Sequence, residues 1–285
     1  MIESDNGMKI DLHCHSHCSD GLLSPQALVE RAALCQINVL ALTDHDTVAG
    51  LDELKLAANQ VPNLQIIDGI ELSVRWKTHE MHIIGLQITP DHPALSRLIA
   101  YQNESRMERA KEIGRQLRSV NVDNAYEKAC LIAGHERVGR PHFAQVLVQS
   151  GQARDMSSAF KQFLVKGRVG YVPTPWVTLE EAVRTIVQAG GQAVIAHPLK
   201  YKMTRSKLLN RIEQFKAAGG VGMEVVSGDM TEQDVKKIAE ICIHTDLLAS
   251  SGSDYHGDSV SRLGLGRQRR LPEDCMPIWR TWTKE

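Results

Sequence analysis

Long hydrophobic runs are missing from this sequence. No apolar run in its 285 residues approaches the roughly 18 to 20 residues that a membrane-spanning helix requires. The opening residues Met1-Ile2-Glu3-Ser4-Asp5 are acidic, whereas a secretory signal begins with basic residues followed by an apolar stretch. We therefore expect a cytoplasmic protein with no membrane partner.

A disulfide framework and a strong net charge are missing as well. The six cysteines are scattered along the chain, unlike the dense pattern of small secreted domains, which is consistent with a reducing compartment. The net charge of −1 says little about partners, and we find no internal repeat or low-complexity tract. The length suits one large core, and single α/β barrels commonly reach this size.

Charge is nevertheless distributed unevenly. Residues 100–170 contain 12 Lys and Arg against 7 Asp and Glu, so the rest of the chain has 21 against 27. The basic middle segment has two interpretations, a set of solvated helical faces or a basic lid that meets a phosphate-bearing ligand.

Apolar runs alternate with helical patterns in the first and last thirds of the chain. Ser24 and Pro25 are typical of the start of a helix, and Thr178 is expected to cap another. The pattern predicts strands that begin near residue 8 and cover residues 38–42, 64–71, 80–86, 192–196, 222–226 and 247–252. Such alternation predicts a parallel sheet with right-handed crossovers.

The middle of the chain lacks this alternation. From about Pro93 to Leu164 only long helices are expected, and residues 171–176 form an extended return. We therefore expect a barrel formed by residues 1–98 and 172–285, interrupted by a helical insertion at residues 99–171. A barrel is favoured over an open sheet because nearly every strand ends in a titratable residue, and closure gathers the strand ends around one centre.

The first strand ends in a His-x-His pair. Side chains at i and i+2 of a strand point to the same side, which places His13 beside His15. Two imidazoles do not complete a metal site, and a lone His-x-His often occurs by chance. A zinc knuckle built on Cys14 and Cys18 would need a second pair nearby. None follows, so these cysteines are expected to pack in the interior.

Further titratable residues follow the later strands. Burying so many polar groups without a metal would cost several kcal/mol each, so together they predict a metal centre. Imidazole and carboxylate ligands suit manganese, iron or zinc, and three ligands per ion would leave positions for water and substrate. The candidate ligands are His13, His15, Asp20, His45, Glu71, His82, His197, Asp254 and His256.

These motifs resemble the PHP (polymerase and histidinol phosphatase) family of metallo-phosphoesterases. The resemblance covers nearly the whole chain. Within the family, the helical insertion and the segments 138–143 and 167–173 are similar to the branch that contains the 3',5'-nucleoside bisphosphate phosphatases and ribonuclease AM. The motifs are Asp11-Leu12-His13-Cys14-His15, Ser19-Asp20-Gly21, Thr43-Asp44-His45-Asp46, Gly69-Ile70-Glu71, His82-Ile83-Ile84-Gly85, Ala196-His197-Pro198 and Gly252-Ser253-Asp254-Tyr255-His256.

The resemblance implies a distorted (β/α)7 TIM-like barrel of α/β class with a helical insertion. It also implies three divalent ions, with Mn2+ expected and iron or zinc as alternatives. In the implied grouping His13, His15 and Asp254 hold one ion. His82 and His197 hold a second, and Glu71 bridges these two. Asp20, His45 and His256 hold the third. Spacing alone supports only the closeness of His13 to His15 and of Asp254 to His256.

The implied activity is phosphoester hydrolysis. Metal-bound hydroxide would attack phosphorus in line while another ion holds the phosphoryl oxygens, and no side chain is assigned as the catalyst. The substrate would be the 3'-phosphate of a 3',5'-nucleoside bisphosphate, or a short 5'-phosphorylated RNA shortened from 5' to 3', with no role for double-stranded DNA. The residues expected to bind a second phosphate are Arg106, Arg109, Arg140 and Lys166, with His142 as a further candidate.

Other interpretations remain open at this stage. The chain could be another PHP phosphatase acting on histidinol phosphate or a sugar phosphate, or a catalytically inactive metal-binding module. An amidohydrolase also has His-x-His on its first strand, but it would need a lysine where this chain has Glu71. His17 would share the side of His13 and His15 only if the strand continued beyond His15, so it is not among the predicted ligands. Trp176, Trp279 and Trp282 are expected to pack rather than to stack on a base.

Overall fold

A computed structural model describes residues 7–76 and 79–282. The chain divides into two compact units, one drawn from residues 1–98 and 177–285 and the other from residues 99–176. The second boundary lies at Trp176 rather than at residue 171. The Tyr101 hydroxyl donates to the Pro175 carbonyl oxygen at 2.8 Å, and the Arg106 guanidinium lies over the Trp176 ring, so this return segment packs with the helices.

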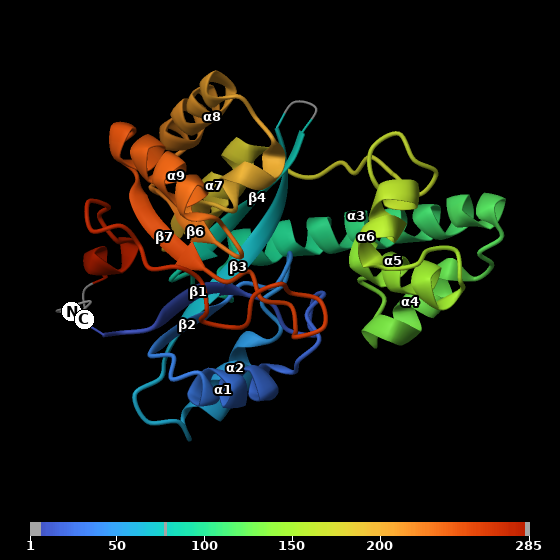
Figure 1. Ribbon diagram of the computed structural model, residues 1–285, viewed down its shortest axis with the longest axis horizontal. Coiled ribbons are helices and arrows are strands. Elements are labelled where there is room, and N and C mark those ends of the chain that lie inside the picture. Colours follow the sequence, from blue (N-terminus) through green and yellow to red (C-terminus); the bar gives the residue numbers. More distant parts are fainter. Residues whose placement is uncertain (1–6, 77–78, 283–285) are drawn as a thin grey trace. The chain divides into compact units, whose positions relative to one another are not determined.

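Seven strands form the sheet of the first unit, in the order β1 to β7 (Figure 1). Backbone hydrogen bonds also join the outermost strands, because the Asp254 amide donates to the His13 carbonyl at 2.8 Å and the His15 amide donates to the Tyr255 carbonyl at 2.9 Å. The predicted barrel-like α/β fold is therefore confirmed. The strands are β1 (Ile10–Cys14), β2 (Val39–Leu42), β3 (Gln65–Trp76), β4 (His79–Leu86), β5 (Gln192–Ile195), β6 (Gly222–Ser227) and β7 (Leu248–Gly252).

The prediction of an all-parallel sheet was wrong at β4. This strand pairs antiparallel with both β3 and β5, whereas the other neighbouring pairs are parallel. Only residues 77–78, which lie outside the described residues, separate β3 from β4. A connection this short joins antiparallel strands, since a parallel crossover needs about a dozen residues. Glu71 and His82 therefore lie inside the strands of a long hairpin and not at strand ends.

Helices cover the sheet of the first unit on two sides. In Figure 1, α1 (Pro25–Leu34) and α2 (Leu51–Ala58) lie on one side, and α7 (Leu179–Gln188), α8 (Arg205–Ala217) and α9 (Glu232–His244) lie on the other. The predicted caps are confirmed, because the Ala27 amide donates to Ser24 Oγ at 3.1 Å and the Glu181 amide donates to Thr178 Oγ1 at 3.2 Å. Short 3-10 helices occupy η3 (Pro198–Tyr201) and η4 (Ile278–Thr281).

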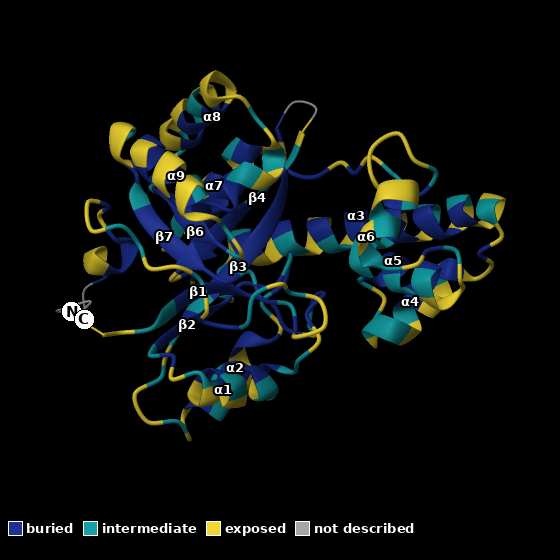
Figure 2. Cartoon of the chain, in the orientation of Figure 1, coloured by how far each residue is buried: buried dark blue, intermediate teal, exposed yellow. Residues whose placement is uncertain are grey.

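The interior of the first unit is apolar up to one edge of the sheet. The strands are buried along most of their length, while the outer faces of α8 and α9 are exposed (Figure 2). Trp279 and Trp282 pack in this core beside Leu12 and Val194, as predicted for the two tryptophans. The core fixes the strands, so polar side chains that follow them are held on a rigid frame.

The second unit is built from the predicted helices. It consists of most of α3 (Pro93–Leu117), η1 (Arg118–Val120), α4 (Ala125–Ala133), α5 (Arg140–Gln149), α6 (Met156–Ala159) and a π-helical turn, η2 (Phe160–Leu164). A separate core containing Ile113, Leu117, Phe143 and Leu147 holds these helices together. Among the described helices, none has the length and apolar character needed to cross a membrane.

Candidate metal centre

The structure brings all nine predicted ligand residues into one cluster in the first unit. Their donor atoms form four overlapping groups, and within each group the atoms lie within 4.8 Å of one another. The groups are His15, Asp20, His45 and His256; His13, Glu71 and His197; His13, His15 and Asp254; and His45, Glu71 and His82.

Glu71 is the centre of the cluster. Its Oε1 lies 3.0 Å from His82 Nδ1 and 2.9 Å from His197 Nε2. Its Oε2 lies 3.3 Å from His15 Nε2 and 3.0 Å from His45 Nδ1. The two carboxylate oxygens thus face different sets of imidazoles, which is the arrangement that a bridging carboxylate requires.

The His-x-His pair lies on the same side of the first strand, as its spacing predicts. The Nε2 atoms of His13 and His15 are 3.1 Å apart. Asp254 Oδ1 lies 3.5 Å from His13 Nε2 and 3.6 Å from His15 Nε2. Because β7 lies beside β1, residues from opposite ends of the chain converge on one position.

Asp20 belongs to a different part of the cluster. Its Oδ1 lies 3.3 Å from His256 Nε2, and its Oδ2 lies 3.8 Å from His45 Nε2. The imidazoles of His15 and His256 stack with ring centroids 4.0 Å apart. The loop after β1 therefore contributes to a group of donors distinct from the one around His13.

Burial and mutual charge shift the pKa values of these groups in opposite directions. Burial opposes protonation of His15, but hydrogen bonds to the Asp254 and Glu71 carboxylates outweigh it and raise the pKa of the imidazole to about 9. Burial and the nearby Lys200 ammonium lower the pKa of His197 to about 4. Burial also opposes ionisation of Glu71, yet the surrounding imidazoles hold its pKa well below the usual value.

The donor set fits divalent metal ions. Buried polar atoms of the cluster lack well-formed hydrogen bonds among the described residues: His197 Nδ1 has no partner, and His45 Nδ1 and Glu71 Oε2 lie 3.0 Å apart without the geometry of a hydrogen bond. Buried polar atoms are normally satisfied, so such atoms need an explanation. A metal ion supplies one, because neutral imidazole nitrogens and carboxylate oxygens are the donors that borderline divalent ions prefer.

Three buried carboxylates around the cluster were missed by the sequence prediction. Glu224 on β6 places Oε1 2.8 Å from His13 Nδ1. Asp11 accepts from the backbone amides of Ser253 and Gly266, both at 2.8 Å. Asp44 accepts three hydrogen bonds from the loop after β1. Each is a charged residue inside or directly after an apolar strand, and that signal was available, since buried acids are rare without partners.

Lys200 and Tyr201 were missed as well. Both lie on η3 directly after His197-Pro198. The Lys200 ammonium pairs with Asp254 Oδ2, although 59% of the lysine side chain is exposed. The His82 amide donates to the Tyr201 hydroxyl at 2.9 Å. Their direction depends on the 3-10 turn, which no sequence pattern specified.

The predicted substrate-binding residues lie in the second unit. Arg106 and Arg109 are both buried, with guanidinium carbons 5.1 and 5.4 Å from the centre of the Trp176 ring. Trp176 is itself buried, so its predicted packing role is confirmed. Arg140 is the first residue of α5.

His142 and Lys166 have different surroundings in this unit. His142 Nδ1 accepts from the Gly139 amide at 3.0 Å and so caps α5, which leaves its phosphate contact a prediction. Lys166 is exposed.

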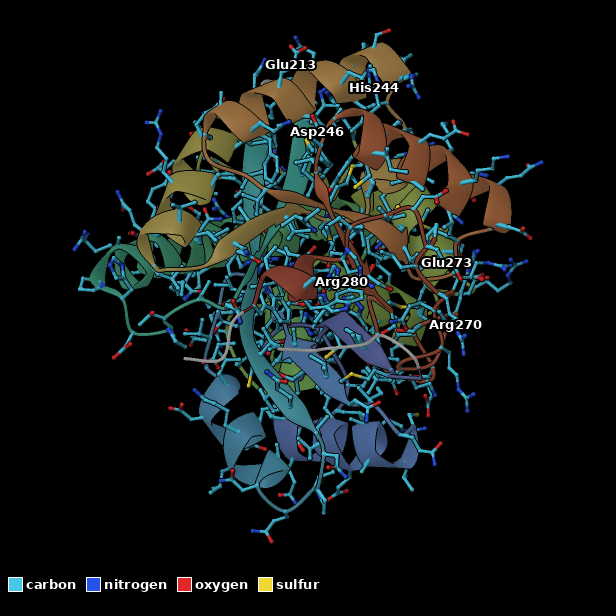
Figure 3. All side chains as sticks on the ribbon, turned by 90° about the vertical axis from the view of Figure 1, so that its left-hand side faces the viewer. Glu213, His244, Asp246, Arg270, Glu273 and Arg280 are labelled. Carbon is cyan, nitrogen blue, oxygen red and sulfur yellow. The ribbon has the colours of Figure 1, made fainter. Side chains whose placement is uncertain are left out.

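Other candidates lie outside the four groups of donors. His17 is exposed, and the Cys14 thiol donates to the Ala41 carbonyl at 3.3 Å in the interior, as expected for a packing residue. Cys18 lies beside His17, with Sγ 3.6 Å from Nδ1. His244 lies at the end of α9, exposed on the outside of the unit (Figure 3).

Comparison with known proteins identifies the family to which the chain is similar. The PHP domain model matches residues 11–192. A 3',5'-nucleoside bisphosphate phosphatase from Chromobacterium violaceum is 42% identical over 275 residues, 95% of each chain. A 5'-3' exoribonuclease from Haemophilus influenzae is 41% identical over 271 residues, 95% of this chain and 98% of the relative.

A solved structure is similar over the same extent. It is described as an amidohydrolase from Chromobacterium violaceum with bound sulfate, and it superimposes with a TM-score of 0.91 at 42% identity over 95% of each chain. The family match extends from the first histidine motif to the first residue of β5, and the relatives extend the similarity to nearly the whole sequence. The chain therefore belongs to the PHP domain family.

Proposed function

We propose that this protein is a metal-dependent phosphoesterase. It would hydrolyse the 3'-phosphate of 3',5'-nucleoside bisphosphates, remove nucleotides from the 5' end of short 5'-phosphorylated RNA, or do both. The observation that supports this most is the convergence of nine imidazole and carboxylate side chains, Glu71 among them, in one cluster. Relatives with about 40% identity are named for these two activities.

The proposed centre holds three divalent ions, with Mn2+ as the expected metal. His13, His15 and Asp254 would hold one ion. His82 and His197 would hold a second, with Glu71 shared between these two. Asp20, His45 and His256 would hold the third. When bound, such ions lower the pKa of water towards neutrality and stabilise charge on phosphoryl oxygens.

Within this centre the protein's own side chains fix positions and balance charge. The two oxygens of Glu71 face different imidazoles, so one side chain sets the separation between neighbouring positions. Asp254 turns Oδ1 towards His13 and Oδ2 towards Lys200. The Lys200 stem is exposed, which places a permanent cation at the edge of the cluster, where an anionic phosphoryl group would approach.

The second unit supplies candidates for binding a second phosphate. Gly139 precedes α5. If this residue had a Cβ atom, that atom would lie 3.9 Å from Arg106 Nη1. Arg106 and Arg140 are therefore close to the N-terminal end of this helix, whose dipole also favours an anion. Guanidinium groups bind phosphate through two parallel hydrogen bonds. We propose Arg106, Arg109, Arg140, His142 and Lys166 as the residues that contact the rest of the substrate.

The test of this function compares three substrates. The Mn2+-loaded protein is incubated with 3',5'-adenosine bisphosphate, adenosine monophosphate and 5'-phosphorylated RNA oligomers, and the products are separated by chromatography. Phosphate release from the bisphosphate supports the phosphatase activity, and stepwise loss of nucleotides from the 5' end supports the exonuclease activity.

Two variants control this experiment, one at an aspartate and one at a histidine. Asp20→Ala removes a proposed ligand and is expected to abolish both activities. His244→Ala removes an exposed imidazole at the last residue of α9 and is expected to change neither activity. If the loaded protein released no product from any substrate, the proposed function would be wrong.

Arg140 provides a separate test of the second-phosphate site. Arg140→Ala is expected to raise KM for the bisphosphate about tenfold or more, which corresponds to the loss of a charged hydrogen bond of about 1.5 kcal/mol. KM for p-nitrophenyl phosphate, which has one phosphate, should change much less. Equal increases for both substrates would refute the role of Arg140.

A further inference from the structure

Glu224 connects two of the proposed metal ligands that come from different strands. It lies in the middle of β6 and is fully buried. One carboxylate oxygen, Oε1, is 2.8 Å from His13 Nδ1. The other, Oε2, accepts a hydrogen bond from the His197 backbone amide at 2.5 Å. Glu224 therefore contacts His13 through its imidazole and His197 through its backbone.

The contact with His13 determines which ring nitrogen carries the proton and which one offers its lone pair to a metal ion. An ionised carboxylate can only accept hydrogen bonds, so the His13 proton is held on Nδ1. The lone pair of Nε2 is then directed towards Glu71 Oε2, His15 Nε2 and Asp254 Oδ1, which lie at 3.4, 3.1 and 3.5 Å. A carboxylate behind a metal-binding histidine fixes both its tautomer and its ring orientation in this way.

The contact with His197 fixes a backbone conformation. His197 has φ of 28° and precedes Pro198, and such values are costly for a residue other than glycine. The hydrogen bond to Glu224 helps to hold the chain in this conformation at the end of β5. The imidazole of His197 consequently reaches Glu71 Oε1 at 2.9 Å.

We propose that Glu224 is a positioning residue that places His13 and His197 together, so that the two metal positions on either side of Glu71 fill as a coupled pair. This inference rests on the proposed metal-dependent function. His13 belongs to two groups of donors, one with His15 and Asp254 and one with Glu71 and His197. A change at Glu224 therefore reaches both positions. Asp20, His45 and His256, the residues proposed to hold the third ion, make no hydrogen bond to Glu224 in the described part of the chain, so this position provides an internal reference.

Glu224→Gln tests the proposal with a side chain of the same shape. If the glutamine oxygen accepts from the His197 amide, its NH2 group faces His13 Nδ1 and forces the proton onto Nε2, the nitrogen that faces the cluster. If the amide is reversed, the NH2 group opposes the His197 N–H instead. Either orientation loses one of the two contacts, because a glutamine has only one acceptor oxygen.

The measurements are metal binding and the tautomer of His13. Mn2+ affinity is followed by the electron paramagnetic resonance signal of free Mn2+, bound metal by elemental analysis, and the tautomer of His13 by imidazole 15N chemical shifts of the protein loaded with diamagnetic Zn2+. We expect two of the Mn2+ positions to weaken together by about 10- to 100-fold, the third to keep its affinity, and the 15N shifts of His13 to change. Circular dichroism checks that the variant is folded.

Ser250→Ala is the matched control. Ser250 pairs with Glu224 in the β6–β7 register and is also fully buried. Its hydroxyl has no hydrogen-bond partner among the described residues, so the control perturbs the same layer of the barrel without removing a hydrogen bond to an imidazole. It is expected to bind Mn2+ as the unaltered protein does. Glu224→Asp, whose shorter side chain cannot span both contacts, should resemble the glutamine variant and not restore binding.

Several results would overturn the proposal. The proposal would be overturned if Glu224→Gln had unchanged Mn2+ affinity or lost affinity at a single position. It would also be overturned if Glu224→Gln and Ser250→Ala both lost affinity equally at all positions. These results differ from failure of the proposed function. If the unaltered protein bound no Mn2+ and hydrolysed no phosphoester, both ideas would be wrong. If it bound metal and was active while Glu224→Gln bound metal normally, only the role of Glu224 would be wrong.

Discussion

Asp44 offers the most direct test of how the cluster is supported. This buried carboxylate follows β2, and its Oδ1 accepts from the Ser16 amide at 2.7 Å and the Ser19 hydroxyl at 2.6 Å. Its Oδ2 accepts from the Ser16 hydroxyl at 2.6 Å. These three bonds hold the loop that carries Asp20. Asp44→Ala should therefore both destabilise the first unit and displace Asp20.

The expected size of the effect follows from the three lost hydrogen bonds. Each net bond contributes about 1 to 1.5 kcal/mol, and the Ser16 amide would be left buried without its acceptor, so we expect a loss of about 3 to 5 kcal/mol. For a unit of this size each kcal/mol lowers Tm by about 2 to 4 °C, which gives a decrease of roughly 6 to 20 °C. Asp44→Asn keeps the two bonds to Oδ1 and should lose only about 1 kcal/mol.

The assay combines thermal unfolding with metal analysis. Asp44→Ala should lose one equivalent of Mn2+, that of the position containing Asp20, whereas Asp44→Asn should retain it. A Tm within 2 °C of the unaltered protein would refute the hydrogen-bond argument. A large decrease in Tm with all metal retained would refute the link between this carboxylate and the position of Asp20.

Three further changes test other parts of the centre. Gly252→Ala would place a Cβ 2.3 Å from His13 Cβ, so β7 must move away from β1, and unfolding experiments should show a loss of about 2 kcal/mol. Removing divalent ions by dialysis against a chelator should lower Tm, and adding Mn2+ should restore it. At a hundredfold excess of Mn2+ over Kd, each site adds about 2.7 kcal/mol to the free energy of unfolding; an unchanged Tm would contradict metal binding. Lys200→Met removes the cation beside Asp254 and should raise the inhibition constant of inorganic phosphate about tenfold. Bound Mn2+, measured in parallel, should be unchanged.

The sequence was sufficient to predict most of the fold and the nine imidazole and carboxylate side chains that cluster in the first unit. His13 and His15 show why, because strand periodicity alone places them on one side, and their Nε2 atoms lie 3.1 Å apart. The helix starts at Ser24 and Thr178 were equally readable, since each cap acts on its own helix. These features depend on a few neighbouring residues.

The long β3–β4 hairpin shows where this kind of prediction fails. The sequence predicts Glu71 at the end of a strand, whereas residues 72–76 continue the strand and pair with β4. The direction of β4 is fixed by its pairing with β3 and with β5, which is more than a hundred residues away in sequence. Pairing between distant strands leaves no local pattern, so the strand-end pattern predicts the right residues with the wrong local geometry.

Glu224 and Asp44 show a different reason for failure. Glu224 lies in a predicted strand and Asp44 follows one, yet the spacing of metal ligands predicts no role for either, because both hold ligands in place and are not ligands themselves. A buried acid costs several kcal/mol unless it is paired, so an acid in an apolar strand already predicts a partner. Here the partners are His13 and His197 for Glu224 and the loop of Asp20 for Asp44. The buried acids outside the ligand set therefore identify which ligands are held rigidly, and metal affinity should depend on them almost as strongly as on the ligands themselves.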